Sequence, residues 1–496
     1  MKAAISVVAG LLLSPVLGLA ASAAALEIPA FGKALEAEGK VELLGVARFQ
    51  TDNPSQDPQG RIRFRLGTDV ASWLRVQTGV TGTAGGTPQD PDGAGVYDFD
   101  RTLQDLSPSL EIDEAYLDFV LPRFDVRAGL QKFAWGKLDG VQPNDLLNPE
   151  KLADPLLDDE VDRQIAIPAL SVTWNVPETA SGILPRDLRV TGVAVPIYVP
   201  FRIADDDERW YPPLARVPET SQSMGLTVRN EGDFRDGDVP ERDLRNGALA
   251  ARVAGSLGRA DFGLYYYDGY DTQPAFEVEA RGFVRANPLS PQLFDVRSEI
   301  EIFPTYDRIR AAGGDLAVSA LDATFRLEGA WVAGRLYPRA VRTIVANPEI
   351  GAVDPALLLL GVEQEVPIDL DAVNVERDGI EWGANVERFF GETFVLVQAM
   401  QTAVLGNRAD LLISDTETRF AMTLRRTFLD EKLETELIGI YGMQGVYGVA
   451  HPRVTYDLTD AFDVRVGLLF IEGHEGSFLG QYRDNDQAYV RLRYLF

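Results

Sequence analysis

Arginines recur at alternate positions in two short stretches near opposite ends of the sequence. The first stretch holds Arg61, Arg63 and Arg65, and the second, AYVRLRYLF at 488–496, holds Arg491 and Arg493. Side chains of a β-strand alternate between two faces, so each set would lie on one face of its strand. The guanidinium keeps its charge at any physiological pH and donates paired hydrogen bonds to carboxylates and phosphates. The two sets together could therefore attract anions.

Carboxylates follow the same alternation elsewhere, as at Glu114 and Asp118 and at Glu434 and Glu436. Opposite charges on facing walls of an enclosed space would create a transverse field that orients polar solutes, with the arginines weakly favouring anions. An alternative stays open, in which these charges only neutralise each other and hold the shape of the protein. The full set of candidate lining residues is Arg61, Arg63, Arg65, Glu114, Asp118, Arg127, Arg326, Glu328, Glu434, Glu436, Arg491 and Arg493.

The elements that would position these side chains are β-strands with one apolar and one charged face. A soluble sheet would need helices or a second sheet to cover its apolar face, yet helical periodicity is confined to short stretches such as 144–160. A closed transmembrane barrel needs no second layer, because its apolar face contacts lipid and its charged face lines a water-filled lumen. The two-residue period is clearest in 61–67, 124–131, 321–331, 432–439 and 462–470.

Short turns and long acidic loops rich in proline and glycine alternate along the chain. This alternation predicts an all-β protein, a transmembrane antiparallel up-and-down β-barrel of 18 strands with long extracellular loops and short periplasmic turns. A count of 16 stays open, because 61–82 could form one bent strand. Closure would place the second and the last strand on either side of the first, and so join the two arginine sets into one basic wall.

The first residues have one lysine, an apolar run from Ile5 to Leu19 and small residues after it, which indicates a signal peptide at 1–23. A short periplasmic segment at 24–38 and the barrel at 39–496 would follow. The net charge of -28 argues against nucleic acid as a partner and against simple attraction to anionic membrane surfaces. The absence of cysteine excludes disulfides, thiolate metal sites and cysteine nucleophiles.

Two loops carry apolar residues that need cover. The loop at 135–168 is amphipathic and rich in carboxylates, and we expect it to fold into the lumen as a constriction, with a surface lid as the alternative. The segment DPALLLLGV at 354–362 is expected to pack inward or to contact an apolar solute. The leucines of the first loop that need cover are Leu146, Leu147, Leu152, Leu156 and Leu157.

Metal and enzyme chemistry find little support in the sequence. His451 and His474 are the two histidines, so an imidazole cluster is excluded and no cofactor or metal is expected. The carboxylates at 87–100 could at most bind Ca²⁺, and their spacing does not fit an EF-hand loop. A hydrolase would need a histidine base beside a serine; Ser477 follows His474 by three residues, but nothing orients the pair. We therefore expect no enzyme.

The last strand resembles the outer-membrane assembly signal of Gram-negative barrels, with Val490, Leu492, Tyr494 and the terminal Phe496 on one parity. The stretch FDVRAGLQKFAWGKLDGVQPNDLLNPEKLADP at 124–155 and LYYYDGYDTQP at 264–274 resemble a largely uncharacterised porin-like barrel family that is distantly similar to alginate-export porins. The resemblance implies a barrel in the outer membrane of a Gram-negative bacterium, in contact with lipid, lipopolysaccharide and the barrel-assembly machinery. It implies no catalytic residue, and a homo-oligomer stays open.

These features predict a porin for passive diffusion of small polar or anionic solutes through a charged lumen. A dedicated transporter for hydrophobic or polymeric solutes, with loops that close the pore, is the main alternative, and the segment at 354–362 is the feature that favours it.

Overall fold

The structure is a computed structural model of the chain. It describes residues 26–28, 33–49, 59–84, 109–140, 142–151, 156, 160–177, 185–202, 210, 220–223, 226–234, 237, 239–287, 290–339, 346–348, 353–370, 372–406, 411 and 416–496.

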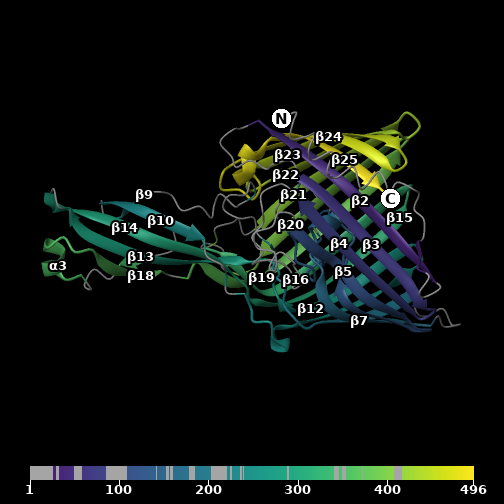
Figure 1. The fold of residues 1–496 in the computed structure, drawn as a ribbon, viewed down its shortest axis with the longest axis horizontal. Helices are drawn as coiled ribbons and strands as arrows, with labels where there is room; N and C mark the ends of the chain where they lie inside the picture. The colour runs from purple at the N-terminus through teal and green to yellow at the C-terminus, as the bar shows by residue number, and fades with distance from the viewer. Residues whose placement is uncertain are drawn as a thin grey trace.

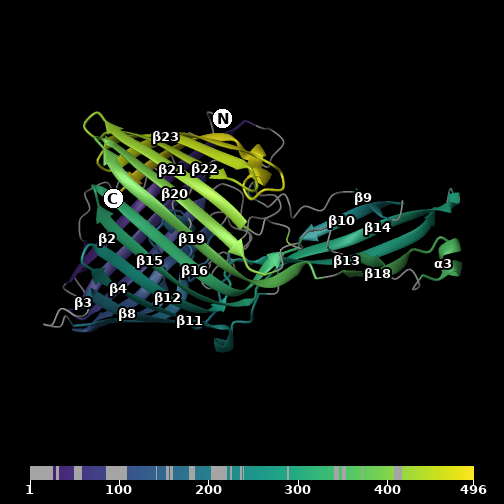
Figure 2. The same ribbon diagram turned by 180° about the vertical axis from the view of Figure 1, so that it is seen from behind.

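One closed barrel of 18 antiparallel strands forms the body of the molecule (Figures 1 and 2). Each strand pairs with the next in the following order: β2 (Lys33–Arg48), β3 (Gln59–Ala71), β4 (Leu74–Ala84), β5 (Ser109–Val120), β6 (Phe124–Gln131), β7 (Ile167–Asn175), β8 (Arg186–Val195), β11 (Ala248–Leu257), β12 (Ala260–Tyr270), β15 (Arg308–Ala320), β16 (Ala323–Pro338), β19 (Asn374–Phe390), β20 (Thr393–Val404), β21 (Thr416–Phe428), β22 (Leu433–Gly442), β23 (Tyr447–Thr459), β24 (Phe462–Gly473) and β25 (Gln487–Leu495).

The barrel closes where β2 pairs with the last strand. The β2–β25 ladder runs from Lys40 opposite Leu495 to Arg48 opposite Gln487, and β3 pairs with the other edge of β2. The predicted 18 strands are confirmed, and β3 and β4 are separate strands joined by a tight turn rather than one bent strand. A short strand, β1 (Leu26–Ile28), pairs with the start of β2, so strand structure already begins within the segment 24–38.

Side-chain alternation gives the barrel an apolar outside and a charged inside. Along β24, Val466, Leu468 and Phe470 are exposed, whereas Arg465 and Leu469, at alternate positions, are buried. Exposed apolar side chains in this pattern suit contact with the hydrocarbon of a bilayer. A closed barrel suits the same environment, because each strand pairs with a neighbour on both edges. Among the described residues no helix is long and apolar enough to cross a membrane.

Tight turns connect several strand pairs at the end of the barrel that holds the C-terminus. Between β15 and β16, Leu321 and Asp322 both have left-handed φ values, of 56° and 55°. Two consecutive left-handed residues are the geometry of the two-residue hairpin turn that matches the twist of the flanking strands. We call this end the short-turn end, and the opposite end the long-loop end.

Three of the long loops contain strands that the sequence analysis did not predict. These strands form a separate six-stranded sheet, the projecting sheet, that extends away from the long-loop end (Figures 1 and 2). Phe276 and Val278 alternate there with Glu277 and Glu279, so the two-residue period was present but was masked by the acidity of the loops. Its strands are, in spatial order, β17 (Ala346–Pro348), β18 (Gln364–Leu370), β13 (Ala275–Asn287), β14 (Ser290–Thr305), β10 (Leu226–Phe234) and β9 (Thr220–Ser223).

The segment at 354–362 does not pack into the lumen, and that expectation is wrong. Pro355–Leu359 forms helix α3 at the far tip of the projecting sheet (Figure 1). Leu359 and Leu360 are 76% and 77% exposed there, because the sheet carries them away from the barrel. Among the described residues, the other short helices are α2 (Glu160–Arg163) and two 3₁₀ turns at Leu244–Asn246 and Gly480–Asn485.

Candidate functional site

We call the segment between β6 and β7, residues 132–166, the constriction loop. Its described residues, 132–140, 142–151, 156 and 160–166, lie inside the barrel. Its backbone N–H groups at Lys137, Leu138 and Asn144 donate to the carboxylate of Glu328 at 2.7, 3.2 and 2.9 Å. Glu328 is completely buried and projects from the inner face of β16. A carboxylate that accepts several N–H groups fixes the backbone that supplies them. This anchor holds the first half of the loop against the wall, as expected of a constriction.

Neighbouring strands hold the same half of the loop. The side-chain amide of Gln398 on β20 accepts from the N–H of Asp139 at 3.2 Å and donates to its carbonyl at 2.8 Å. Lys137 forms an ion pair with Asp315 on β15 at 2.6 Å. Residues 137–139 and Asn144 therefore contact β15, β16 and β20 through groups on the inner face of the barrel.

An apolar core fixes the two ends of the loop. Trp135, Leu147 and Ile165 are buried together with Tyr265 and Tyr267, which project inward from β12. Asn148 joins the two ends of the loop, since it accepts from the N–H of Phe133 at 2.7 Å and donates to the carbonyl of Ile165 at 2.8 Å. Among the leucines predicted to need cover, Leu147 is buried and Leu146 and Leu156 are partly buried, while Leu152 and Leu157 lie outside the described residues.

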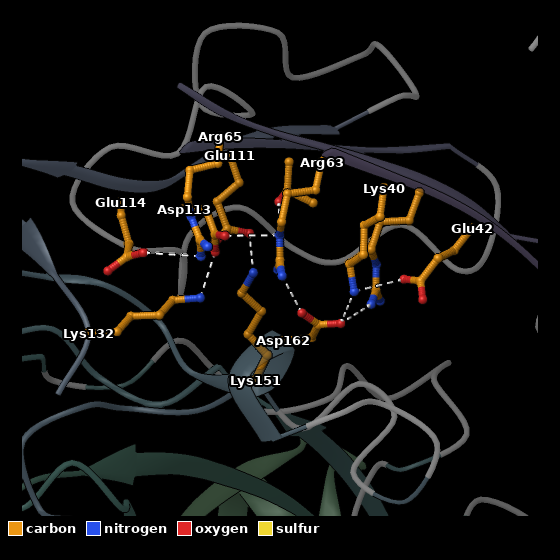
Figure 3. A network of polar contacts seen from close by, with 12 residues as sticks. Lys40, Glu42, Arg63, Arg65, Glu111, Asp113, Glu114, Lys132, Lys151 and Asp162 are labelled. Carbon is orange, nitrogen blue, oxygen red and sulfur yellow. Dashed lines mark hydrogen bonds and ion pairs between the residues drawn. The ribbon is translucent and has the colours of Figure 1, made fainter. Parts of the chain in front are cut away.

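The second half of the loop reaches the opposite wall through a carboxylate of its own. Asp162 in α2 lies among Lys40 of β2 and Arg61 and Arg63 of β3 (Figure 3). Its carboxylate lies 2.5 Å from the Lys40 ammonium and 3.7 Å from the Arg61 guanidinium, and it also pairs with Arg63. The arginines predicted for this wall thus meet a loop carboxylate that the sequence analysis did not single out.

Further ion pairs extend this cluster along the wall (Figure 3). Arg63 also contacts Asp113 at 2.9 Å, and Lys132 contacts the same carboxylate at 2.6 Å. The β4–β5 ladder shifts register at Asp113, and both Asp113 and Glu114 then contact inward-facing cations. Such a bulge redirects a side chain, which an analysis of strict alternation does not predict. Lys151 of the loop pairs with Glu111 on the same strand.

The remaining predicted lining residues are also in ion pairs rather than in separate basic and acidic walls. Arg65 contacts Glu38 at 2.8 Å and Glu114 at 3.5 Å. Arg491 and Arg493 of β25 flank β2 at the seam, as expected. The other contacts are Arg491 with Glu42 at 3.8 Å, Arg493 with Asp463 at 2.6 Å, Arg127 with Asp118 at 2.9 Å, Arg326 with Glu387 at 2.7 Å, Glu434 with Arg425 at 3.9 Å, and Glu436 with Arg453.

Two carboxylates on the constriction loop have pKa values shifted in opposite directions. Burial acts to raise the pKa of Asp162, but Arg63, Lys40 and Arg61 outweigh it and hold the pKa well below its usual range. Burial raises the pKa of Asp139, and the charge of Glu387 adds to this effect against the opposing charge of Arg326. Asp162 therefore stays ionised at pH values where Asp139 begins to bind a proton.

Among the described residues, neither histidine ring forms a hydrogen bond to a serine hydroxyl. His451 is buried, and its Nε2 lies 2.8 Å from the hydroxyl of Tyr489. Ser477 donates to the backbone carbonyl of His474, whose ring accepts from the N–H of Gly476. Among the described residues no group of three His, Cys, Asp or Glu side chains could hold a metal ion, and the segment 87–100 lies outside them.

The residues of the expected assembly signal lie on the outer face at the short-turn end. Val490 is 44% exposed, and the ring of Phe496 packs 5.2 Å from that of Phe64. Backbone hydrogen bonds between Phe496 and Gly39 continue the β2–β25 ladder to the last residue.

Comparisons with known proteins show similar barrels at very low identity. No family model matches the chain, and no curated protein matches it. OccAB1 and OccAB4 of Acinetobacter baumannii are 11% and 10% identical, with TM-scores of 0.48 and 0.46; the alignments cover 93% of this chain and 95% and 97% of theirs. Wzi, described as a carbohydrate-binding outer-membrane β-barrel involved in capsule assembly in Escherichia coli, is 10% identical over 93% of this chain and 84% of its own, with a TM-score of 0.44.

These identities do not place the chain in a family, and its fold rests on its own strand pairing. The similarity to alginate-export porins stays a prediction from the sequence motifs. The structural conclusion is a closed antiparallel barrel of 18 strands with a loop anchored across its interior.

Proposed function

We propose that the protein is an outer-membrane channel for passive diffusion of small polar or anionic solutes. The observation that carries this proposal is the partial exposure of charged side chains on the inner wall, on the short-turn side of the constriction. The side chains of Arg65, Arg127 and Arg425 are 36%, 37% and 42% exposed there. Charged side chains with this exposure inside a closed barrel need water around them, so the lumen is filled with water up to the constriction.

The constriction loop sets the size limit of the channel. It is anchored to β15, β16 and β20 on one side and to β2 and β3 on the other, so a solute has to pass beside it. The weak anion preference rests on Arg61 and Arg63. A solute that passes the constriction comes close to these two positive charges and to the negative charge of Asp162. Because the wall arginines are paired with carboxylates, the preference is modest rather than absolute.

A Gram-negative outer membrane is the location that suits this barrel. Lipid and lipopolysaccharide would surround its apolar outside, and the barrel-assembly machinery would recognise the last strand with Val490, Leu492, Tyr494 and Phe496. The signal peptide at 1–23 lies outside the described residues and belongs to the same proposal.

Reversal potentials in a salt gradient test the anion preference. The lumen variant Arg61→Ser, Arg63→Ser, Arg65→Ser is compared with Arg281→Ser, Arg285→Ser, Arg297→Ser, which removes the same charge from the projecting sheet. We expect selectivity to shift towards cations in the lumen variant and to stay unchanged in the sheet variant. An unchanged reversal potential in both variants would show that the arginines only neutralise carboxylates.

A transporter whose loops close the pore is the second candidate, and the burial of the constriction favours it. The side chains of Asp113, Lys132 and Asp162 are only 6%, 8% and 6% exposed. The apolar segment at 354–362 no longer supports this candidate, because α3 lies at the tip of the projecting sheet. If the folded protein shows no conductance in planar bilayers, the closed transporter is favoured over the diffusion channel.

A further inference from the structure

We propose that Lys40, Arg61 and Arg63 form a carboxylate-binding site on the barrel wall, which Asp162 occupies until a solute carboxylate displaces it and widens the pore. This inference rests on the proposed channel function.

The three cations of this site lie on barrel strands, whereas Asp162 lies on a short helix of the constriction loop. Lys40 and Arg63 are directly opposite each other in the β2–β3 ladder, and Arg61 lies two residues before Arg63 on the same face of β3. Residues two apart on a strand are separated by about 7 Å, so the three cations form one compact patch. Asp162 projects from α2, a helix of four residues. Withdrawal of Asp162 therefore needs a local movement of α2 and no change in the barrel.

Asp162 compensates cations of the wall that are mostly buried. It pairs with Lys40 and Arg63, which also contact the wall carboxylates Glu42 and Asp113 respectively. Removal of one partner from a buried ion pair is strongly unfavourable, because it leaves an uncompensated charge. Asp162 can therefore leave readily only when another anion takes its place.

A solute has a route to this patch from the hydrated side. Arg65 lies two residues beyond Arg63 on β3, towards the short-turn end, and its side chain is 36% exposed. Lys40, Arg61 and Arg63 retain 15%, 16% and 12% exposure, more than the 6% of Asp162. The three cations thus remain partly accessible to solvent beside the Asp162 carboxylate.

The chemistry of Asp162 defines the ligand that replaces it. Asp162 places one oxygen against Lys40 and Arg61 and the other against Arg63. A solute carboxylate offers the same two planar oxygens with the same charge, whereas chloride offers a single spherical acceptor. Arginine forms its strongest contacts with planar bidentate groups. Small carboxylates should therefore open the constriction, and chloride at equal ionic strength should not.

The test is single-channel conductance in planar bilayers, in potassium chloride and then in potassium acetate at equal ionic strength, each normalised to the conductivity of the bulk solution. For the wild type we expect a higher normalised conductance in acetate. For Asp162→Asn we expect a raised conductance already in chloride, no further increase in acetate, and a reversal potential shifted towards anions. Asp139→Asn is the matched control, because it removes the same charge from the same loop and should keep the acetate response of the wild type.

Two further variants keep the test decisive if Asp162→Asn folds poorly. Asp162→Glu retains a carboxylate and should retain the acetate response. Arg61→Ser removes one of the cations that hold Asp162, at 3.7 Å, and should raise the conductance in chloride and reduce the further increase in acetate. Heat-modifiable mobility on gels confirms the folded barrel in each case.

The outcomes separate this inference from the proposed function. A conducting wild type with the same conductance in acetate and chloride overturns the carboxylate site and leaves the channel standing. The same holds if Asp162→Asn and Asp139→Asn both behave as the wild type. If no variant conducts in any salt although the barrel is folded, the proposed channel function is overturned.

Discussion

The two anchors of the constriction loop use opposite arrangements of charge. At Glu328 the carboxylate belongs to the barrel wall, and the loop supplies three backbone N–H groups. At Asp162 the carboxylate belongs to the loop, and the wall supplies the cations Lys40, Arg61 and Arg63. The first anchor is built from directional hydrogen bonds and the second from charges. We infer that the first half of the loop is a permanent part of the pore and that the second half can respond to ions.

The largest expected effect is the loss of the Glu328 anchor. Glu328→Ala leaves three N–H groups without their acceptor in a buried position. Each such group costs about 1–3 kcal/mol, so the segment 136–144 should leave the wall. The measurement is single-channel conductance together with the denaturant midpoint, and we expect a larger conductance and a lower midpoint. Glu328→Gln keeps an acceptor oxygen and should show a smaller change; equal behaviour of Glu328→Ala and the wild type would contradict this role.

A smaller effect is expected at Gly136, whose φ of +123° disfavours any other residue. A Cβ at Gly136 would lie 2.6 Å from Gln142 Oε1 and 2.8 Å from Glu328 Oε1. Gly136→Ala should therefore disturb the Glu328 anchor and alter conductance. Gly140→Ala is the control, because Gly140 also has a positive φ of +79° but its Cβ would meet open space. If both variants change conductance equally, backbone strain rather than the anchor explains the effect.

Salt should separate the two anchors. Raising the ionic strength from 0.1 to 1 M shortens the screening length from about 10 Å to about 3 Å. We expect amide hydrogen exchange to accelerate at 160–163 and to stay unchanged at 137–144, because backbone hydrogen bonds to a buried carboxylate are screened much less. Uniform acceleration over both segments would show that the loop moves as one unit.

Mild acid should have the smallest effect. The depressed pKa of Asp162 means that its stabilising contribution is complete above the ordinary Asp pKa of about 3.9 and is lost only as the pH falls through the lower folded value. Normalised conductance between pH 7 and about pH 5 should therefore not show release of α2. If conductance changes in this pH window and the change disappears in Asp139→Asn, it arises from Asp139, whose pKa is raised. If the change instead disappears in Asp162→Asn, the role given to Asp162 is contradicted.

The barrel was predictable from the sequence because many of its strands have a two-residue period. Alternation such as that of Arg61, Arg63 and Arg65 determines both the strand and the face that points inward, and the seam followed from closure. The partners of these arginines were not predictable. Asp162 is separated from Arg63 by 99 positions and lies in a loop without periodicity, and Asp113 faces inward because of a bulge.

The projecting sheet was missed for a different reason. Its strands have the same two-residue period as the barrel strands, as in Phe276 to Arg281, but they lie in stretches whose acidity and glycine and proline content indicate loops. Local pattern alone does not state which sheet a strand joins. The parallel pairing of β10 with β14 depends on contacts between distant segments.

The most direct test of the account compares the single-channel conductance of the wild type with that of a variant in which residues 136–163 are replaced by a short Gly-Ser linker. We predict a steady open conductance for the wild type and a clearly larger one for the variant, with the barrel folded in both. Equal conductance would show that the constriction loop does not limit the pore, and silence of both proteins would contradict a diffusion channel.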